Sequence, residues 1–210
     1  YYIPMEEIGG DYYDFIPFRD NHQLGIFISD VSGHGVPAAL ITSMVKTLME
    51  TSGEQRQNPS ELLFYINQKI TGLTGGNFLT AFYSVYDQKN KKLRFARGAH
   101  NPPFLIRNCH EIIELSSRGK ILGIEKDIEF EQKEIDMQKG DKILFYTDGL
   151  TEAANKQGIM FEEILPSALM RYKDKPAREY LDSIYHELVR HQDGIRFEDD
   201  VCLIVLEITE

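Results

Sequence analysis

The 210-residue sequence has few basic residues and no long apolar run. Its 33 acidic residues outnumber 23 lysines and arginines, which gives a net charge of −10. This balance argues against nucleic acid as a main partner, because a phosphate backbone needs a basic face. Since no apolar run approaches the length of a membrane span, we expect no membrane contact by this segment.

Cysteine is also scarce. Cys109 and Cys202 lie far apart without C-x-x-C spacing, so they suggest neither a zinc site nor a disulfide framework. We therefore expect a reducing, cytoplasmic setting, although a full-length protein could be membrane-anchored. The chain begins with Tyr1 and runs directly into strand-like sequence, which we interpret as one domain, residues 1–210, taken from a longer protein.

The hydrophobic pattern predicts an α+β fold with antiparallel strands. Alternation and β-rich composition predict strands at 12–17, 23–30, 80–86, 92–96, 104–107, 111–115, 129–135, 142–147 and 201–208. Apolar spacing of three and four predicts helices at 36–50, 59–73, 162–171 and 177–191, with a loop at 51–58. The short hairpins exclude a doubly wound parallel sheet.

Two of the expected helices have well-defined apolar faces. The first carries two apolar rows at a spacing of four, which predict a wide buried stripe: Leu40, Met44, Leu48 and Ile41, Val45, Met49. The second is expected to point four residues inward: Leu62, Ile66, Ile70 and Leu73.

Four acidic groups stand out, and three of them abut hydrophobic strands: Asp11/Asp14, Asp30, Asp148 and Asp199/Asp200. Carboxylates are costly to desolvate there, and clustered like charges raise one another's pKa. No Arg or Lys lies within three positions of Asp11, Asp30 or Asp148. A cation is the obvious compensating charge, and oxygen ligands select Mg²⁺ or Mn²⁺.

Each acidic group also has a purely structural interpretation. Asp30 could cap the following helix, Asp148-Gly149 could form a turn, and Asp199-Asp200 could be a solvated edge. Asp11 and Asp14 differ by an odd number, so on a regular strand they face opposite sides. Together, four structural explanations are less attractive than one metal site.

Five ordered motifs carry a resemblance: Gly9-Gly10-Asp11-Tyr12-Tyr13-Asp14, Asp30-Val31-Ser32-Gly33-His34-Gly35, Gly98-Ala99-His100-Asn101-Pro102-Pro103, Tyr146-Thr147-Asp148-Gly149-Leu150-Thr151-Glu152 and Asp199-Asp200-Val201. The chain resembles the PPM (PP2C-type) serine/threonine phosphatases, in the bacterial SpoIIE/RsbU-like branch. The resemblance implies a four-layer α/β/β/α sandwich, with two antiparallel sheets packed face to face and helices outside.

The resemblance also implies roles. Asp30 would bridge two Mn²⁺ or Mg²⁺ ions, with the Val31 carbonyl on the second ion. Asp11, Asp148 and Asp199 would be further catalytic metal ligands. The ions would activate a water that hydrolyses phosphoserine or phosphothreonine without a protein nucleophile.

The same resemblance implies less direct roles for four more residues. Asp14 and Asp200 would be outer-shell or third-metal ligands. His34 and His100 are candidates for the acid that protonates the leaving group, or for a phosphate contact. The alternative is a structural role, with the histidine fixed in the glycine turn.

Two departures from the family pattern concern phosphate binding. Animal-type members carry a histidine two residues after the bridging acid, where this chain has Ser32. They also carry an arginine before the first acidic motif, whereas residues 5–8 contain none. Phosphate would therefore rest on the metals and backbone, or on a residue supplied by a partner.

By resemblance, the substrate would be a phosphorylated STAS-type anti-anti-sigma protein in a partner-switching pathway. Further partners would be an upstream sensor domain in the same chain and a second copy of the chain in a homodimer. The helical segment 36–73 is expected to relay the signal. One alternative is a catalytically weak docking module of the same fold. Another is a two-metal nucleotidyl cyclase, disfavoured because no Lys/Arg-rich triphosphate clamp lies near the motifs.

Overall fold

The computed structural model describes residues 1–5, 7–18, 22–107, 111–194 and 196–209. The strands are β1 (Tyr2–Ile3), β2 (Tyr12–Pro17), β3 (Gln23–Val31), β4 (Leu79–Asp87), β5 (Lys92–Gly98), β6 (Phe104–Arg107), β7 (Glu111–Glu114), β8 (Gln132–Asp136), β9 (Lys142–Tyr146) and β10 (Val201–Glu207). The helices are α1 (Val36–Thr51), η1 (Gly53–Gln57), α2 (Pro59–Ile70), α3 (Asp148–Thr151), η2 (Phe161–Glu163), α4 (Leu165–Arg171) and α5 (Ala177–Gln192).

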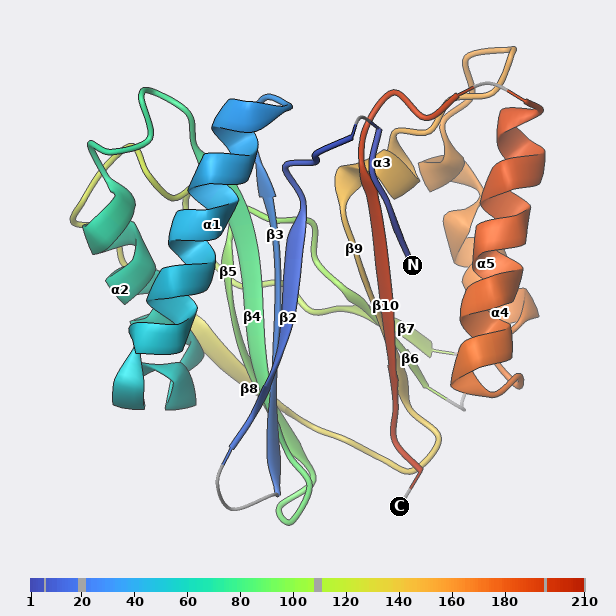
Figure 1. Ribbon diagram of the computed structural model, residues 1–210. Helices are drawn as coiled ribbons and strands as arrows, with labels where there is room; N and C mark the ends of the chain where they lie inside the picture. The colour runs from blue at the N-terminus through green and yellow to red at the C-terminus, as the bar shows by residue number, and fades with distance from the viewer. Residues whose placement is uncertain (6, 19–21, 108–110, 195, 210) are drawn as a thin grey trace. The chain divides into compact units, whose positions relative to one another are not determined.

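The strands form two antiparallel sheets, one in each of two compact units (Figure 1). Unit 1 comprises Tyr1–Met5, Pro103–Leu115 and Gln138–Glu210, and its sheet has the order β1-β10-β9-β6-β7. Unit 2 comprises Glu6–Pro102 and Ser116–Met137, and its sheet has the order β2-β3-β4-β5-β8. The two antiparallel sheets with their helices confirm the expected α+β sandwich class.

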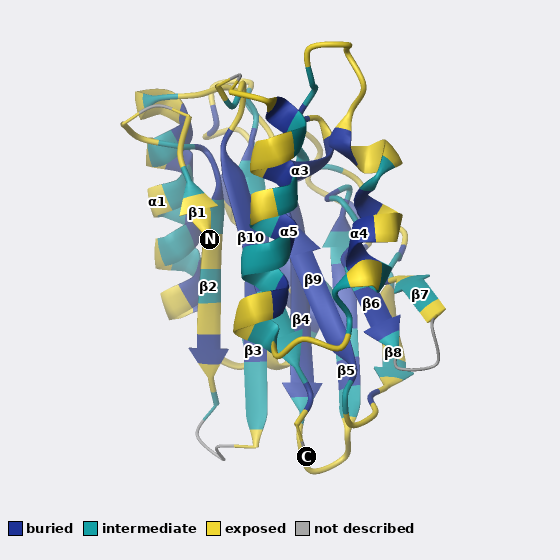
Figure 2. Ribbon diagram, turned by 90° about the vertical axis from the view of Figure 1, so that its right-hand side faces the viewer, coloured by how far each residue is buried: buried dark blue, intermediate teal, exposed yellow. Residues whose placement is uncertain are grey.

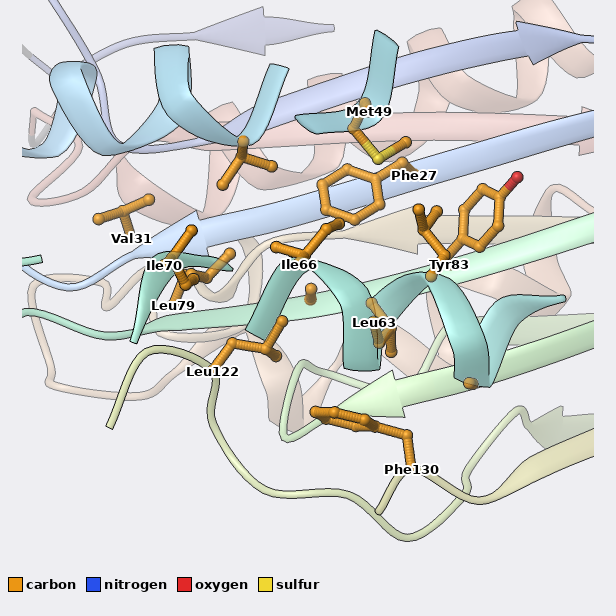
Figure 3. Packing of buried hydrophobic residues seen from close by; sticks show 14 of the residues in the cluster. Phe27, Val31, Met49, Leu63, Ile66, Ile70, Leu79, Tyr83, Leu122 and Phe130 are labelled. Carbon is orange, nitrogen blue, oxygen red and sulfur yellow. The ribbon is translucent and has the colours of Figure 1, made fainter. Parts of the chain in front are cut away.

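The core of unit 2 lies between its sheet and the helices α1 and α2. Figure 3 shows Ile66 and Ile70 of α2 packed against Phe27 and Val31 of β3. Phe27 and Val31 are two of the alternate residues of β3 that face the helices, as the pleat of a strand requires. The intervening residues of β3, among them Asp30, face the other side of this sheet.

The core of unit 1 forms where α4 and α5 cover the sheet. Tyr180, Ile184 and Leu188 recur at a spacing of four along α5, and all three are fully buried. They pack with residues of β9 and β10, whereas α5 presents exposed residues on its outer side (Figure 2). The amphipathic spacing of the sequence therefore predicted this helix correctly.

Several expected boundaries were wrong. The loop expected at 51–58 contains the 3₁₀ helix η1, and a short helix that the sequence did not predict, α3, follows β9 at Asp148–Thr151. The expected helix 162–171 is divided into η2 and α4, because Pro166 lacks a backbone N–H and is tolerated only in the first turn of α4. The strand expected from 129 begins at Gln132, since the Glu131 N–H donates to the Arg118 carbonyl instead.

Two apolar residues expected in the core are exposed. Leu40 is 62% exposed, because the sheet and α2 cover only the row of α1 that contains Ile41, Val45 and Met49. Leu73 is 65% exposed, because α2 ends at Ile70 and Leu73 lies in the following turn. Cys202 is buried as a free thiol, and Cys109 lies outside the described residues.

In the ranges given above, no helix has the length and apolar character needed to cross a bilayer.

The core of unit 2 can be tested at Ile66, which is fully buried. We expect Ile66→Ala to lower the free energy of unfolding by about 2–5 kcal/mol, because it removes buried apolar surface and leaves a cavity. Urea denaturation measures the loss. The exposed Thr47→Ala on α1 is the control and should stay within about 0.5 kcal/mol of the parent. Equal losses in both variants would contradict this packing.

Candidate metal-binding carboxylates

Asp30 stands near the end of β3, where the chain turns toward α1. The Ser32 N–H donates to the Phe78 carbonyl at 2.8 Å, and the Phe78 N–H donates to the Ser32 hydroxyl at 2.9 Å. This pair extends the contact between β3 and the chain entering β4. Ser32 therefore has a structural role in this turn.

The turn after Ser32 depends on two glycines with positive φ. Gly33 has a φ of 85° and Gly35 a φ of 70°, a region that side chains with a Cβ rarely adopt. His34 lies between them and is exposed. Asp30 is half-buried, so this turn brings an exposed histidine close in sequence to a partly buried carboxylate.

Asp11 adjoins Asp30 across the sheet. The register of β2 with β3 pairs Tyr12 with Ser29, so the next pair in this register is Asp11 with Asp30. Asp11 is buried, with 6% of its surface exposed. Unit 2 therefore brings two of the predicted carboxylates together.

Gly10 makes a close approach of the backbone possible at the same place. A Cβ at position 10 would lie 2.9 Å from the Val31 carbonyl oxygen and 3.3 Å from the Gly33 carbonyl oxygen. A side chain there would therefore cover the Val31 carbonyl, which the sequence predicted as a metal ligand. The absence of a Cβ leaves this oxygen room for a ligand.

Asp14 faces the opposite side of the sheet from Asp11, as the odd spacing predicted. Its cross-strand partner is Phe27, which lies in the core beneath the helices. The Asp14 carboxylate accepts hydrogen bonds from the Tyr12 hydroxyl and the Lys46 ammonium, both at 2.7 Å. These contacts tie β2 to α1, so the geometry gives Asp14 a structural role.

His100 is buried, with 2% of its surface exposed. Its Nδ1 lies 2.7 Å from the Thr80 hydroxyl oxygen. The Arg97 guanidinium donates to the His100 carbonyl at 2.9 Å and to the Ser117 carbonyl at 3.1 Å. Burial makes a direct phosphate contact by this ring unfavourable, in contrast to the exposed His34.

Unit 1 holds the second pair of predicted carboxylates, Asp148 and Asp199. Burial raises the pKa of Asp148 to about 6, and the negative charges of Asp199 and Glu152 contribute to the rise. The ionised form of Asp148 is therefore disfavoured by its surroundings. A cation near these carboxylates would compensate that cost.

Two hydrogen bonds between Thr147 and Cys202 join the strands β9 and β10 beside this pair. The Cys202 N–H donates to the Thr147 hydroxyl at 2.9 Å, and the Thr147 N–H donates to the Cys202 carbonyl at 3.2 Å. A Cβ on Gly149 would lie only 2.1 Å from the Asp200 carbonyl oxygen, so position 149 requires glycine. The end of β9 and the start of β10 are thus held in direct contact.

Asp200 contacts the N-terminal segment of unit 1. Its carboxylate accepts a hydrogen bond from the Met5 N–H at 2.7 Å, and Asp200 itself is buried. Asp199 is exposed and accepts a bond from the Asp200 N–H at 2.7 Å. Asp199 also lines a cavity of about 300 Å³, together with Glu152, Arg196 and other residues of unit 1.

The structure therefore forms two pairs of carboxylates, one in each unit. Over the ranges that the structure describes, no three His, Cys, Asp or Glu side chains form a group arranged to hold a metal ion. The sequence missed the supporting hydroxyls of Thr80 and Thr147. Thr80 lies opposite Asp30 in the strand register, and Thr147 directly precedes Asp148 in the sequence. Their position beside predicted acidic residues was the signal that could have identified them.

Thr147 offers a test of how Asp148 is held. We expect Thr147→Val to lower the free energy of unfolding by about 1–3 kcal/mol, because the buried Cys202 N–H loses its acceptor. Hydrogen exchange at the Cys202 amide should become faster. Thr147→Ser keeps the hydroxyl and is the matched control. If the valine and serine variants exchanged this amide at the same rate, the hydroxyl would not be holding β10.

Comparison with known proteins adds a family relationship. A family model described as stage II sporulation protein E (SpoIIE) matches residues 20–209. The chain is also similar to phosphoserine phosphatase RsbU of Bacillus subtilis, with 32% identity over 206 residues that cover 97% of this chain and 61% of RsbU. The chain thus spans less than two thirds of the length of this relative.

Solved structures show the same fold. The chain is similar to the SiaA-PP2C domain of Pseudomonas aeruginosa, with a TM-score of 0.88 and 20% identity over 99% of this chain and 83% of that one. It is also similar to RsbX, whose structure was determined in complex with magnesium, with a TM-score of 0.71 and 18% identity over 98% of this chain and 91% of that one.

Proposed function

Since the chain belongs to the SpoIIE family of PP2C-type serine/threonine phosphatases, we propose that it hydrolyses phosphoserine or phosphothreonine in a protein substrate with two Mn²⁺ or Mg²⁺ ions. The observation that carries this proposal is the presence of the family's carboxylates as two pairs, each held at strand ends by its own unit. The magnesium complex of RsbX supports the choice of metal.

The residues of both units fit hard divalent ions. We propose that Asp11, Asp30 and the Val31 carbonyl of unit 2 are metal ligands, and that Asp148 and Asp199 of unit 1 are metal ligands as well. All of these donors are oxygens, which Mg²⁺ and Mn²⁺ prefer. The crowded charge around Asp148 and the absence of a Cβ beside the Val31 carbonyl are the structural observations that suit a cation.

The ions, when bound, would lower the pKa of a water molecule and align it with the phosphorus atom. The chain's own contribution is to hold the ligands rigidly. Ser32 and Phe78 anchor the turn after Asp30, and Thr147 anchors the strand before Asp148. Fixed ligands need little rearrangement when substrate binds, which favours catalysis by orientation.

Protonation of the leaving serine or threonine oxygen needs a group that can reach it. His34 is exposed in the glycine turn after Asp30, so we propose it as the acid in preference to the buried His100. Asp14 is left out of this ligand set, because its carboxylate pairs with the Lys46 ammonium on the helix side of the sheet. Asp200 stays a proposed outer-shell or third-metal ligand.

The substrate class follows from the relationship to RsbU. RsbU is named a phosphoserine phosphatase, and we propose that this chain acts on a phosphorylated STAS-type anti-anti-sigma protein in a partner-switching pathway. The upstream sensor domain and the homodimer stay predictions. Phosphate release from such a phosphoprotein, compared with release from p-nitrophenyl phosphate, measures whether the protein is the preferred substrate.

Asp30 provides the test of catalysis. We expect Asp30→Asn to reduce phosphate release by more than about 100-fold, because the amide removes a charged ligand from the proposed site. Phosphate release from p-nitrophenyl phosphate with Mn²⁺ measures this, and EDTA should abolish the activity of the parent. The control is Glu163→Gln, an exposed acid of η2. Activity that persists in Asp30→Asn with EDTA present would refute the proposal.

Metal binding can be measured without substrate. A ligand that binds only the folded state stabilises it, by about 2.7 kcal/mol at a concentration 100 times its Kd. We therefore expect Mn²⁺ to raise the Tm of the parent and to have a much smaller effect on Asp148→Asn. An equal rise in both proteins would contradict the assignment of Asp148. No Mn²⁺ binding by the parent would favour a docking module over an enzyme.

A further inference from the structure

Thr80 lies directly opposite Asp30 in the sheet of unit 2. The register of β3 with β4 pairs Asp30 with Thr80, between the pairs Ser29–Ala81 and Val31–Leu79. Directly opposed residues of antiparallel strands place their side chains on the same face, with Cβ atoms about 4.5–5.5 Å apart. Thr80 and Asp30 are therefore direct cross-strand neighbours on the same face of this sheet.

The Thr80 hydroxyl is in turn bonded to His100. Its oxygen lies 2.7 Å from the His100 Nδ1, and the imidazole ring is almost completely buried. A histidine in this position cannot act on substrate directly. It can, however, set the direction in which the hydroxyl hydrogen points.

The backbone holds His100 in one place. Ala99 has a φ of 56° and forms a bridge with Ala81, the residue after Thr80. The Arg97 guanidinium donates to the His100 carbonyl and also to the Ser117 carbonyl. The left-handed backbone of Ala99, its bridge to Ala81 and the hydrogen bonds of Arg97 thus hold His100 against β4.

Only one arrangement of donors and acceptors lets the Thr80 hydroxyl donate to a carboxylate while it stays bonded to His100. Thr has a single hydroxyl hydrogen, and an ionised Asp can only accept. If Nδ1 carries the proton, His100 donates to the Thr80 oxygen, and the Thr80 hydrogen can be donated elsewhere. A ligating carboxylate commonly receives such a bond from a neighbouring group, which orients it toward its metal.

We propose that Thr80 and His100 are positioning residues, in which Nδ1-protonated His100 orients the Thr80 hydroxyl as a donor to the Asp30 carboxylate. This inference rests on the proposed function, in which Asp30 is a metal ligand. It gives the histidine of the Gly98–Pro103 motif a role that involves neither substrate contact nor proton transfer to the leaving group. By orienting the Asp30 carboxylate, Thr80 and His100 increase the affinity of the proposed site for its metal.

Calorimetric titration of the metal-free chain with Mn²⁺ tests the proposal. We expect Thr80→Val to weaken Mn²⁺ binding by about 10- to 100-fold, since it removes the bond that orients a ligand. Thr80→Ser keeps the hydroxyl and should bind within about threefold of the parent. Ser84→Ala is the matched control, because Ser84 lies on the same face of β4, opposite Ile26, and its buried hydroxyl has no hydrogen-bond partner among the described residues.

The tautomer of His100 gives an independent readout. Nitrogen-15 NMR of the metal-free parent should show the proton on Nδ1, because the proposed hydrogen bond requires His100 to donate to the Thr80 oxygen. This measurement tests the direction of the His100–Thr80 hydrogen bond even if Thr80→Val fails to fold. An Nε2-protonated ring, or Mn²⁺ binding by folded Thr80→Val within threefold of the parent, would overturn the inference.

Asp30→Asn separates this inference from the proposed function. Loss of Mn²⁺ binding in Asp30→Asn with none in Thr80→Val would refute only the positioning role. Unchanged Mn²⁺ binding in Asp30→Asn would refute the metal site itself.

Discussion

Repulsion between carboxylates at the ends of hydrophobic strands is the constraint on which this structure depends. Asp11 is buried, Asp30 is half-buried, and Asp148 has its pKa raised by burial and by neighbouring negative charge. Burial and neighbouring negative charge disfavour the ionised form of Asp148, and a cation beside these carboxylates would offset that cost. The fold keeps these carboxylates in place because the hydrophobic burial of the strands that carry them fixes the positions of those strands.

The supports around these carboxylates are neutral. Ser32 and Thr147 hold the backbone on either side of the acidic motifs by hydrogen bonds, and Gly10 and Gly149 allow the chain to approach neighbouring carbonyl groups closely. The lysine of α1, by contrast, pairs with Asp14 on the other face of the sheet. A neutral support fixes the geometry without bringing a positive charge that would compete with a metal ion.

Much of the secondary structure could be predicted from the sequence, because periodicity reports directly on burial. The strand at Phe104–Arg107 agreed to the residue, and the helix beginning at Val36 differed by one residue at its end. Errors arose where a local pattern was ambiguous. Leu40 has helical spacing like that of its buried neighbours, and only the width of the sheet and of α2 decides that it stays exposed. Pro166 could have indicated the break before α4.

The sequence predicted the residue types of the candidate site, but only part of its geometry. The sequence identified the acids, and their odd spacing correctly separated Asp11 from Asp14. It did not show that Lys46 and Tyr12 engage the Asp14 carboxylate, since Lys46 comes from a different element. Nor did it show that His100 is buried against Thr80, a contact between residues 20 positions apart.

By itself, the sequence determined the elements, the family motifs and the oxygen chemistry, because hydrophobic period, glycine turns and acidic residues are local properties. Only the tertiary structure decided which acids are ion-paired, which histidine is exposed and which hydroxyl faces Asp30. Those outcomes depend on strand register, and register is fixed by pairing between distant segments. A shift of one residue between β3 and β4 would move Thr80 away from Asp30 while leaving every motif of the sequence intact.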